Sequence, residues 1–177
     1  MRYYLFLIPF LLIFIFTSNI TEKKVPTPPN IQEFLNKIEQ IESSGGKNTD
    51  HPVVTKDNLQ KDTRAIGRYG LMPNTVKELV NRRRIRGTVS PEMKEVSQMD
   101  PDSMKDYIEA NPDLEDTLAH DLANHVIQKQ QGDPDKAAFS WQMGHNISPD
   151  EITPEVLDNS DYVNKFRRLG TMIVPPQ

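Results

Sequence analysis

The chain of 177 residues contains no cysteine. This absence excludes disulfide bonds, a thiolate nucleophile, a cysteine-ligated metal and a lipid anchor on cysteine, and it leaves the redox compartment open. The sequence also has no excess of positive charge, because 21 lysines and arginines stand against 25 aspartates and glutamates. Proteins that bind nucleic acid over a broad surface are usually basic. We therefore expect no nucleic acid among the partners.

Alternating strand patterns are nearly absent, and the chain has no internal repeat, no heptads and no long low-complexity tract. Its length allows one globular domain. Several segments begin with a capping residue followed by proline, which is typical of helix N-termini. These pairs are Ser90-Pro91, Asp100-Pro101, Asn111-Pro112, Asp133-Pro134 and Ser148-Pro149. The pattern predicts an all-α fold with short turns between the helices.

The first twenty residues contain the one dense apolar run, residues 3–16, after a positively charged start. A run of this length is typical of a secretory signal, and it is short for a membrane span unless it extends to Ile20. A good cleavage site is missing, because Phe16 occupies the position where a small residue is needed. Residues 1–20 are therefore either a cleaved signal peptide or a signal anchor that holds the protein to the membrane through residues 3–20.

Both alternatives place the folded part outside the cytoplasmic membrane, in the periplasm or cell envelope. Residues 21–29 are rich in proline and charge and are expected to form a short stiff linker. We expect the folded domain over residues 30–170, followed by a tail at residues 171–177.

The first folded helix is predicted to carry a carboxyl group on its apolar side. Asn30 is a good N-cap, and Glu33 stands in the capping-box position. The apolar residues that recur at helical spacing are Ile31, Phe34, Leu35, Ile38 and Ile41. At about 100° per residue, Glu42 falls inside this stripe. Gly45 and Gly46 are expected to end the helix in the left-handed conformation.

A half-buried carboxyl group tends to have a raised pKa, which is what a general acid needs near neutral pH. Glu42 is therefore a candidate acid, and the alternative is a glutamate that merely extends to solvent at a helix end. Residues 47–64 are polar and rich in turn formers, which predicts a loop or functional flap. Asp50, Asp57 and Asp62 in this segment are candidates for a second carboxylate, although surface solvation is favoured for all three.

Tyr69 lies between Gly67 and Gly70, and flanking glycines allow close approach of the backbone to a ligand. A helix after Pro73 is predicted to end in the basic residues 82–86. These are expected to be a solvated helix C-terminus, the alternative being a patch for phosphate, nucleic acid or an anionic envelope polymer.

Three further helices are predicted over residues 112–131, 134–143 and 161–169, with Gly132 and Gly170 as stops after the first and the last. The four histidines show no metal spacing beyond a loose pair, His120 and His125, so we expect neither a metal nor a cofactor.

Three segments, taken in order, resemble the lytic transglycosylases of the soluble-lytic-transglycosylase type, which share the lysozyme-like fold. The segments are Ile41-Glu42-Ser43-Ser44-Gly45-Gly46, then Ala65-Ile66-Gly67-Arg68-Tyr69-Gly70-Leu71-Met72-Pro73-Asn74-Thr75, then Ala137-Ala138-Phe139-Ser140-Trp141-Gln142-Met143-Gly144. In that family a Glu-Ser pair, a Gly-Leu-Met-Gln segment and an Ala-Tyr-Asn-x-Gly segment follow each other on a helical chain. The resemblance covers about residues 31–166.

The resemblance implies that Glu42 is the single catalytic glutamate, general acid first and general base afterwards. It also implies substrate contacts for Ser43, Tyr69, Gly70, Met72, Trp141, Gln142 and Tyr162. This chain departs from the family where Gly70 replaces a substrate-contacting glutamine and where Trp141-Gln142 replaces Tyr-Asn. For Trp141, packing in the core and a place in the sugar-binding groove are equally expected.

The implied reaction cleaves the β-1,4 bond between MurNAc and GlcNAc in peptidoglycan glycan strands and leaves 1,6-anhydro ends. It requires no cofactor and no second carboxylate, because a hydroxyl of the sugar itself attacks. One alternative is a hydrolase of the same fold that uses water and one of the loop aspartates. Another is a non-catalytic wall-binding or assembly module.

Overall fold

The computed structural model describes residues 29–54 and 63–171. The elements are α1 (Ile31–Ser43), β1 (Val53–Val54), β2 (Thr63–Arg64), α2 (Pro73–Ile85), α3 (Pro91–Val96), α4 (Pro101–Glu109), α5 (Pro112–Lys129), α6 (Pro134–Met143), the 3-10 turn η1 (Pro149–Glu151), α7 (Pro154–Asp158) and α8 (Asp161–Thr171). The chain is mostly helical, as predicted. The expected signal segment at residues 1–20, residues 21–28 of the expected linker and residues 172–177 of the expected tail lie outside the described residues. No helix within the described ranges has the length and apolar character needed to cross a membrane.

The capping residues found in the sequence do begin helices. Ser90, Asp100 and Asp133 each accept a hydrogen bond from a backbone N–H in the first turn of α3, α4 and α6, and proline follows each of them. Asn111 and Ser148 stand at the starts of α5 and η1. The sequence analysis missed α7, although Thr153-Pro154 carries the same signal and the Thr153 hydroxyl accepts from the Val156 N–H.

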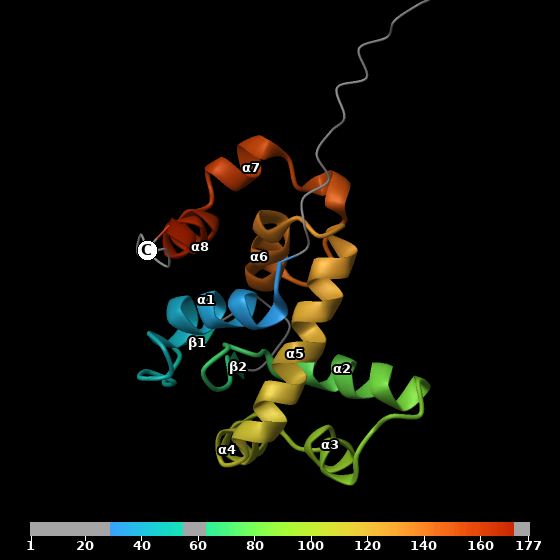
Figure 1. Cartoon of the computed structure of the whole chain (residues 1–177). Helices are drawn as coiled ribbons and strands as arrows, with labels where there is room; N and C mark the ends of the chain where they lie inside the picture. The colour runs from blue at the N-terminus through green and yellow to red at the C-terminus, as the bar shows by residue number, and fades with distance from the viewer. Residues whose placement is uncertain (1–28, 55–62, 172–177) are drawn as a thin grey trace, which may run out of the picture.

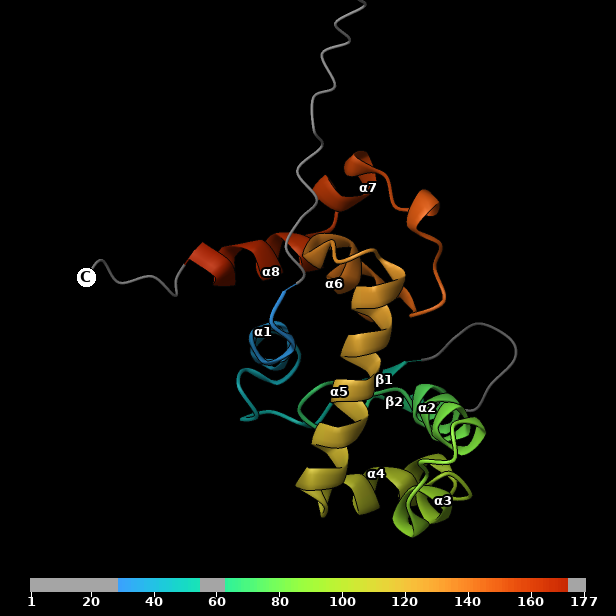
Figure 2. The same ribbon diagram turned by 45° about the vertical axis from the view of Figure 1, so that its right-hand side comes forward.

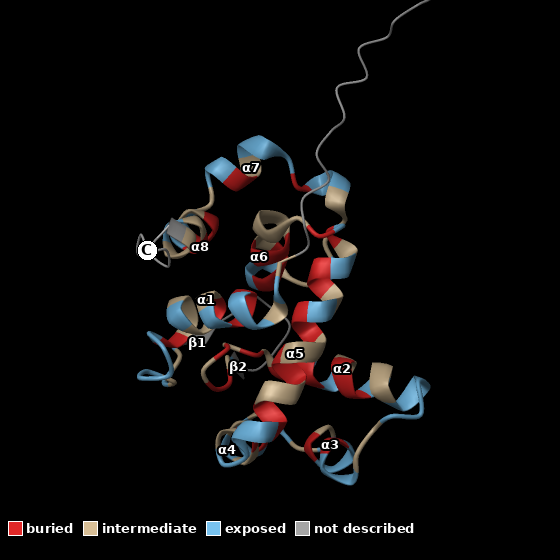
Figure 3. Ribbon diagram, viewed as in Figure 1, coloured by how far each residue is buried: buried red, intermediate tan, exposed pale blue. Residues whose placement is uncertain are grey.

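Helix α5 forms the centre of the molecule (Figures 1 and 2) and packs against α1, α2, α4 and α6. Helices α6, α7 and α8 gather at one end of α5, and α2, α3 and α4 gather at the other. Figure 3 shows buried residues along the length of α5. Its most buried side chains are Leu118, Ala119, Leu122, Ala123 and Val126. Helix α8 closes the other side of α1 and also packs on α6 and α7.

Several predicted boundaries need correction. Helix α1 ends one residue earlier than expected, because Ser44 is already left-handed at φ 55° and Gly45 and Gly46 follow it with positive φ. Gly170 does not stop the last helix, which continues through it to Thr171. Helix α5 ends at Lys129, and the chain then turns at Gln131 and Gly132, both with positive φ.

The segment after α1 contains a short hairpin stem where a loop was predicted. Val53 and Val54 of β1 pair antiparallel with Arg64 and Thr63 of β2. Residues 55–62 between the two strands lie outside the described residues. Because β1 and β2 are adjacent, the stem brings residues 50–54 next to the chain that leads into the turn at residues 66–71.

Candidate functional site

The structure places Glu42 in the last turn of α1, where α8 packs against it. The Tyr162 hydroxyl of α8 donates a hydrogen bond to Oε1 of Glu42 at 2.7 Å. Tyr162 is only 8% exposed, so this bond is screened from water. Two residues that are 120 positions apart in sequence are thus held together.

The turn between residues 66 and 71 covers another side of the Glu42 carboxyl group. Ile66 and Leu71 form an isolated β-bridge, and both side chains are buried. Gly70 has φ 64°, and a Cβ atom on it would lie 2.7 Å from Oε2 of Glu42. The glycine therefore serves two purposes, a left-handed conformation and a close approach of backbone to carboxyl. A glutamine side chain, as the resembled family often has here, would not fit without a shift.

Burial raises the pKa of the Glu42 carboxyl group, while the hydrogen bond from Tyr162 and the charge of His51 oppose this rise. His51 is held nearby, because its Nε2 lies 2.6 Å from the carbonyl oxygen of Gly67 and donates to it. The net effect is a carboxyl group that keeps its proton to higher pH than an exposed glutamate. The sequence analysis considered His51 only as a metal ligand and gave no signal for its place near Glu42.

A second buried carboxyl group lies on the other side of the same turn. Glu115 of α5 is 4% exposed, accepts a hydrogen bond from the Tyr69 N–H at 3.3 Å and faces Nε of Arg68 at 3.5 Å. A Cβ atom on Gly67 would overlap its carboxyl oxygens. Burial is the main cause that raises the pKa of Glu115, and the Tyr69 N–H and the Arg68 charge oppose it. The turn is therefore held between two carboxyl groups, Glu42 and Glu115.

The sequence analysis missed Glu115, although a usable signal was present. At about 100° per residue, Glu115 shares the bearing of Ala119, Leu122 and Val126, which are all buried. The same argument that identified Glu42 on α1 would have identified Glu115 on α5.

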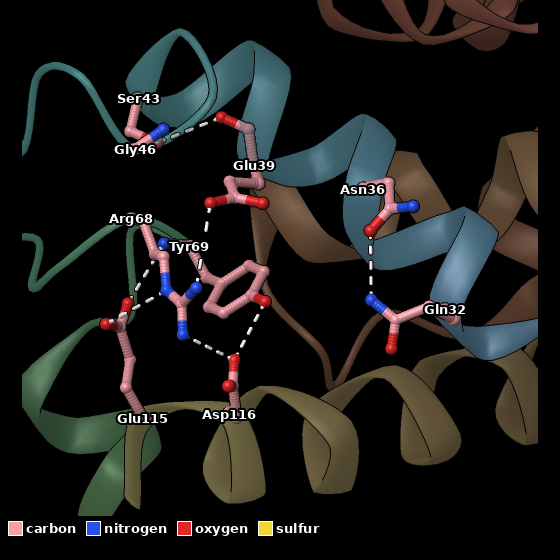
Figure 4. Close-up of polar contacts among 9 residues, drawn as sticks. All are labelled: Gln32, Asn36, Glu39, Ser43, Gly46, Arg68, Tyr69, Glu115 and Asp116. Carbon is pink, nitrogen blue, oxygen red and sulfur yellow. Dashed lines mark hydrogen bonds and ion pairs between the residues drawn. The ribbon is translucent and has the colours of Figure 1, made fainter. Parts of the chain in front are cut away.

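Arg68 connects the turn to both of its neighbouring helices (Figure 4). Its guanidinium group lies 3.8 Å from Glu39 of α1, and it donates a hydrogen bond of 2.7 Å to Asp116 of α5. The Tyr69 hydroxyl donates to the same Oδ1 of Asp116 at 2.9 Å. These contacts leave the turn little freedom to move relative to α1 or α5.

Three residues for which the resemblance implies substrate contacts are buried and make contacts within the fold. Ser43 is 1% exposed, and its hydroxyl donates to the Glu39 carbonyl and accepts from the Gly46 N–H. The Tyr69 ring is buried, and its hydroxyl is occupied by Asp116. The Trp141 ring packs edge-on against Phe34, with 5.9 Å between the two ring centroids.

Trp141 still contributes to the arrangement of the site. Its Nε1–H donates to the Tyr69 carbonyl at 3.2 Å, which ties the third resembling segment to the second. Met72 is half-buried as the N-cap of α2, and Gln142 is exposed near the end of α6. Of the predicted site residues, the structure brings Gly70 and Tyr162 into contact with Glu42.

Among the described residues, the loop contributes His51 to the surroundings of Glu42 and no second carboxylate. Asp50 is exposed and pairs with Arg64 at 3.4 Å, while Asp57 and Asp62 lie outside the described residues. The predicted His120 and His125 pair is replaced by an edge-on contact between His125 and His145. Within residues 29–54 and 63–171, no three His, Cys, Asp or Glu side chains are grouped so as to hold a metal.

Comparisons of the chain with protein-family models, with curated proteins and with solved structures found no match. The helical architecture stands on the structure itself. The lysozyme-like relationship stays a prediction that depends on the three resembling segments and on the residues around Glu42.

The close contact at Gly70 leads to a prediction with a matched control. Gly70→Ala and Gly87→Ala both place alanine at positive φ, but nothing lies within 4 Å of a Cβ on Gly87. Gly87→Ala should lower the free energy of unfolding by about 1 kcal/mol through strain alone. Gly70→Ala should cost about 1 kcal/mol more, because the methyl group displaces Glu42 from its bond to Tyr162. Urea unfolding measures both losses, and equal losses would contradict the contact.

The buried Glu115 leads to a second prediction. Glu115→Ala should lower the free energy of unfolding by about 1–3 kcal/mol, because it leaves the buried Tyr69 N–H without its acceptor. The control is Asp113→Ala, which removes an exposed carboxyl group from the same first turn of α5 and should cost less than about 1 kcal/mol. Similar losses for the two variants in urea unfolding would show that Glu115 does not anchor the turn.

Proposed function

We propose that this protein is a peptidoglycan lytic transglycosylase that cleaves the β-1,4 bond between MurNAc and GlcNAc. One observation supports the proposal above the others. The segments that carry the resemblance converge on one carboxyl group with a raised pKa, that of Glu42. Gly70 lies against Glu42, Tyr162 donates to it, and Trp141 fixes the turn by its bond to the Tyr69 carbonyl.

In the proposed reaction, protonated Glu42 donates its proton to the glycosidic oxygen as the bond to the anomeric carbon breaks. The C6 hydroxyl of the same MurNAc residue then attacks the anomeric carbon and forms the 1,6-anhydro ring. The Glu42 carboxylate accepts the proton that this hydroxyl loses, so the glutamate ends in its starting state. The Tyr162 O–H stabilises the carboxylate between the two proton transfers, because it can donate to the charged form.

Among the residues that the structure describes, the surroundings of Glu42 favour this course over hydrolysis. An ordinary glycosidase places a second carboxylate across the scissile bond as nucleophile or base. Glu115 is occupied by the Tyr69 N–H and Arg68 on the far side of the turn, and Asp50 is exposed and paired with Arg64. A cleft open to glycan strands, an extracytoplasmic location and export through residues 1–20 are parts of the same proposal.

The proposal predicts that Glu42→Gln abolishes the clearing of peptidoglycan in a zymogram. The variant should be at least as stable as the parent at pH 7. Burial raises the pKa of Glu42, so the protonated group stabilises the fold at low pH and this stabilisation is lost as pH rises through that pKa. A neutral amide does not titrate, so the variant lacks this pH dependence.

Glu33→Gln on the exposed side of α1 is the control and should clear peptidoglycan as the parent does. Mass spectrometry should find 1,6-anhydro ends; reducing ends would indicate a hydrolase, and clearing by Glu42→Gln would refute the catalytic role.

A second prediction concerns pH. The hydrogen bond from Tyr162 lowers the pKa of Glu42, so Tyr162→Phe should raise it. Because the reaction begins with protonated Glu42, the alkaline limb of the pH profile of kcat/KM should move to higher pH in the variant. The maximal rate should fall about tenfold, since the carboxylate formed in the reaction loses a donor. Tyr107→Phe on α4 is the control. If the alkaline limb of Tyr162→Phe stays where it is in the parent, Tyr162 does not lower the pKa of the catalytic acid.

A further inference from the structure

The basic end of α2 divides into two groups of cations with different surroundings. Arg82 pairs with Glu78 on its own helix, and Arg83 pairs with Asp121 of α5. A solvated helix C-terminus was expected here, and these two arginines are instead partly buried in ion pairs. Arg84 instead lines a hollow between α2 and α3.

This hollow has a volume of about 410 Å³. Its lining consists of three cations, three neutral polar residues and two valines: Lys77, Arg84, Lys94, Asn81, Ser97, Gln98, Val80 and Val89. No acidic residue is among them. Since the whole chain carries a net charge of −4, the hollow is a local exception on an acidic protein.

Helix geometry explains why the positive charges gather here. Lys77, Asn81 and Arg84 are spaced i, i+4 and i+7 on α2. Lys94 lies on α3, and Ser97 and Gln98 follow directly after the end of that helix at Val96. The two acidic residues of α3, Glu92 and Glu95, are exposed and do not belong to the lining. Arg84 donates to Asn81 at 2.6 Å, which orients its guanidinium group within the lining. Among the described residues, no acidic side chain forms an ion pair with Lys77, Arg84 or Lys94.

We propose that this hollow binds a flexible phosphodiester chain whose phosphates are joined by polyol units. The three cations can pair with phosphate charges, and the amide and hydroxyl groups of Asn81, Ser97 and Gln98 can bond to phosphate oxygens and polyol hydroxyls. Val80 and Val89 offer apolar surface to the carbon atoms of the polyol.

The lining distinguishes this ligand from a nucleic acid. Single-stranded nucleic acids are held by aromatic side chains on which the bases stack. The hollow has no aromatic residue in its lining. Figures 1 and 2 place α3 at the opposite end of the molecule from α8, whose Tyr162 contacts Glu42. Binding in the hollow is therefore separate from the chemistry proposed for Glu42.

The test measures binding of the full chain to fluorescently labelled poly(glycerol phosphate) by anisotropy at several salt concentrations. The double variant Lys77→Gln/Lys94→Gln should bind about tenfold more weakly at low salt. Its plot of log affinity against log salt should be shallower by about 1.4, since each lost phosphate contact removes about 0.7 from the slope for a single-stranded polyanion. The matched control, Lys47→Gln/Lys165→Gln, removes the same charge from exposed positions and should bind like the parent.

Three results would overturn the proposal. They are equal losses in the two double variants, tighter binding of a thymidine oligonucleotide of equal charge than of poly(glycerol phosphate), and no binding at low salt. Thermal unfolding verifies that the variants fold, and Arg84→Gln replaces the double variant if that one does not. Glu42→Gln should bind the polymer as the parent does, so a failed proposal for Glu42 leaves this test intact.

Discussion

The arrangement around Glu42 depends on a short turn that is held between two carboxyl groups, one half-buried and one buried. Glu42 of α1 lies against Gly70, and Glu115 of α5 lies against Gly67. Neither glycine can be exchanged for a larger residue without moving a carboxyl group. Burying two carboxyl groups costs free energy, and the donors that offset this cost are the Tyr162 hydroxyl, the Tyr69 N–H and the Arg68 guanidinium group.

Glu115 is buried and Glu42 is half-buried, and the two carboxyl groups also differ in their surroundings. Glu115 accepts from a backbone N–H and faces an arginine, and Arg68 is fixed in turn by Glu39 and Asp116. Such a group holds structure together. Glu42 has a tyrosine hydroxyl on one oxygen and a glycine backbone beside the other, so it is the carboxyl group that remains available to exchange a proton.

The sequence predicted the local parts of this arrangement well. A capping residue before proline marks a helix start regardless of the rest of the fold, so five such starts were found, and Glu42 was identified from the apolar stripe of α1. The family resemblance pointed to Tyr162 as a substrate contact, and in the structure this residue donates a hydrogen bond to Glu42. These features depend on neighbours in sequence or on a known order of segments.

The parts that were missed depend on contacts between distant residues. Glycines beside Tyr69 indicated a close approach of the backbone, but they could not indicate that the partner was a carboxyl group of the protein itself. The ring of Tyr69 packs in the core, and its hydroxyl is satisfied there by Asp116, 47 residues later. Trp141 also packs in the core, and its N–H is satisfied by the Tyr69 carbonyl, 72 residues earlier. No spacing along the chain encodes such pairs.

The separation of 120 residues between Glu42 and its hydrogen-bond donor has a consequence for biosynthesis. Domains fold as units once enough of the chain has emerged, and contacts between distant residues form late. A nascent chain that has released α1 but not yet α8 contains Glu42 without Tyr162 and without the helix that shields it. Under the proposed function, the acid is assembled only when α8 docks, so an enzyme that cuts the cell wall would stay inactive until α8 has been synthesised and has packed against α1.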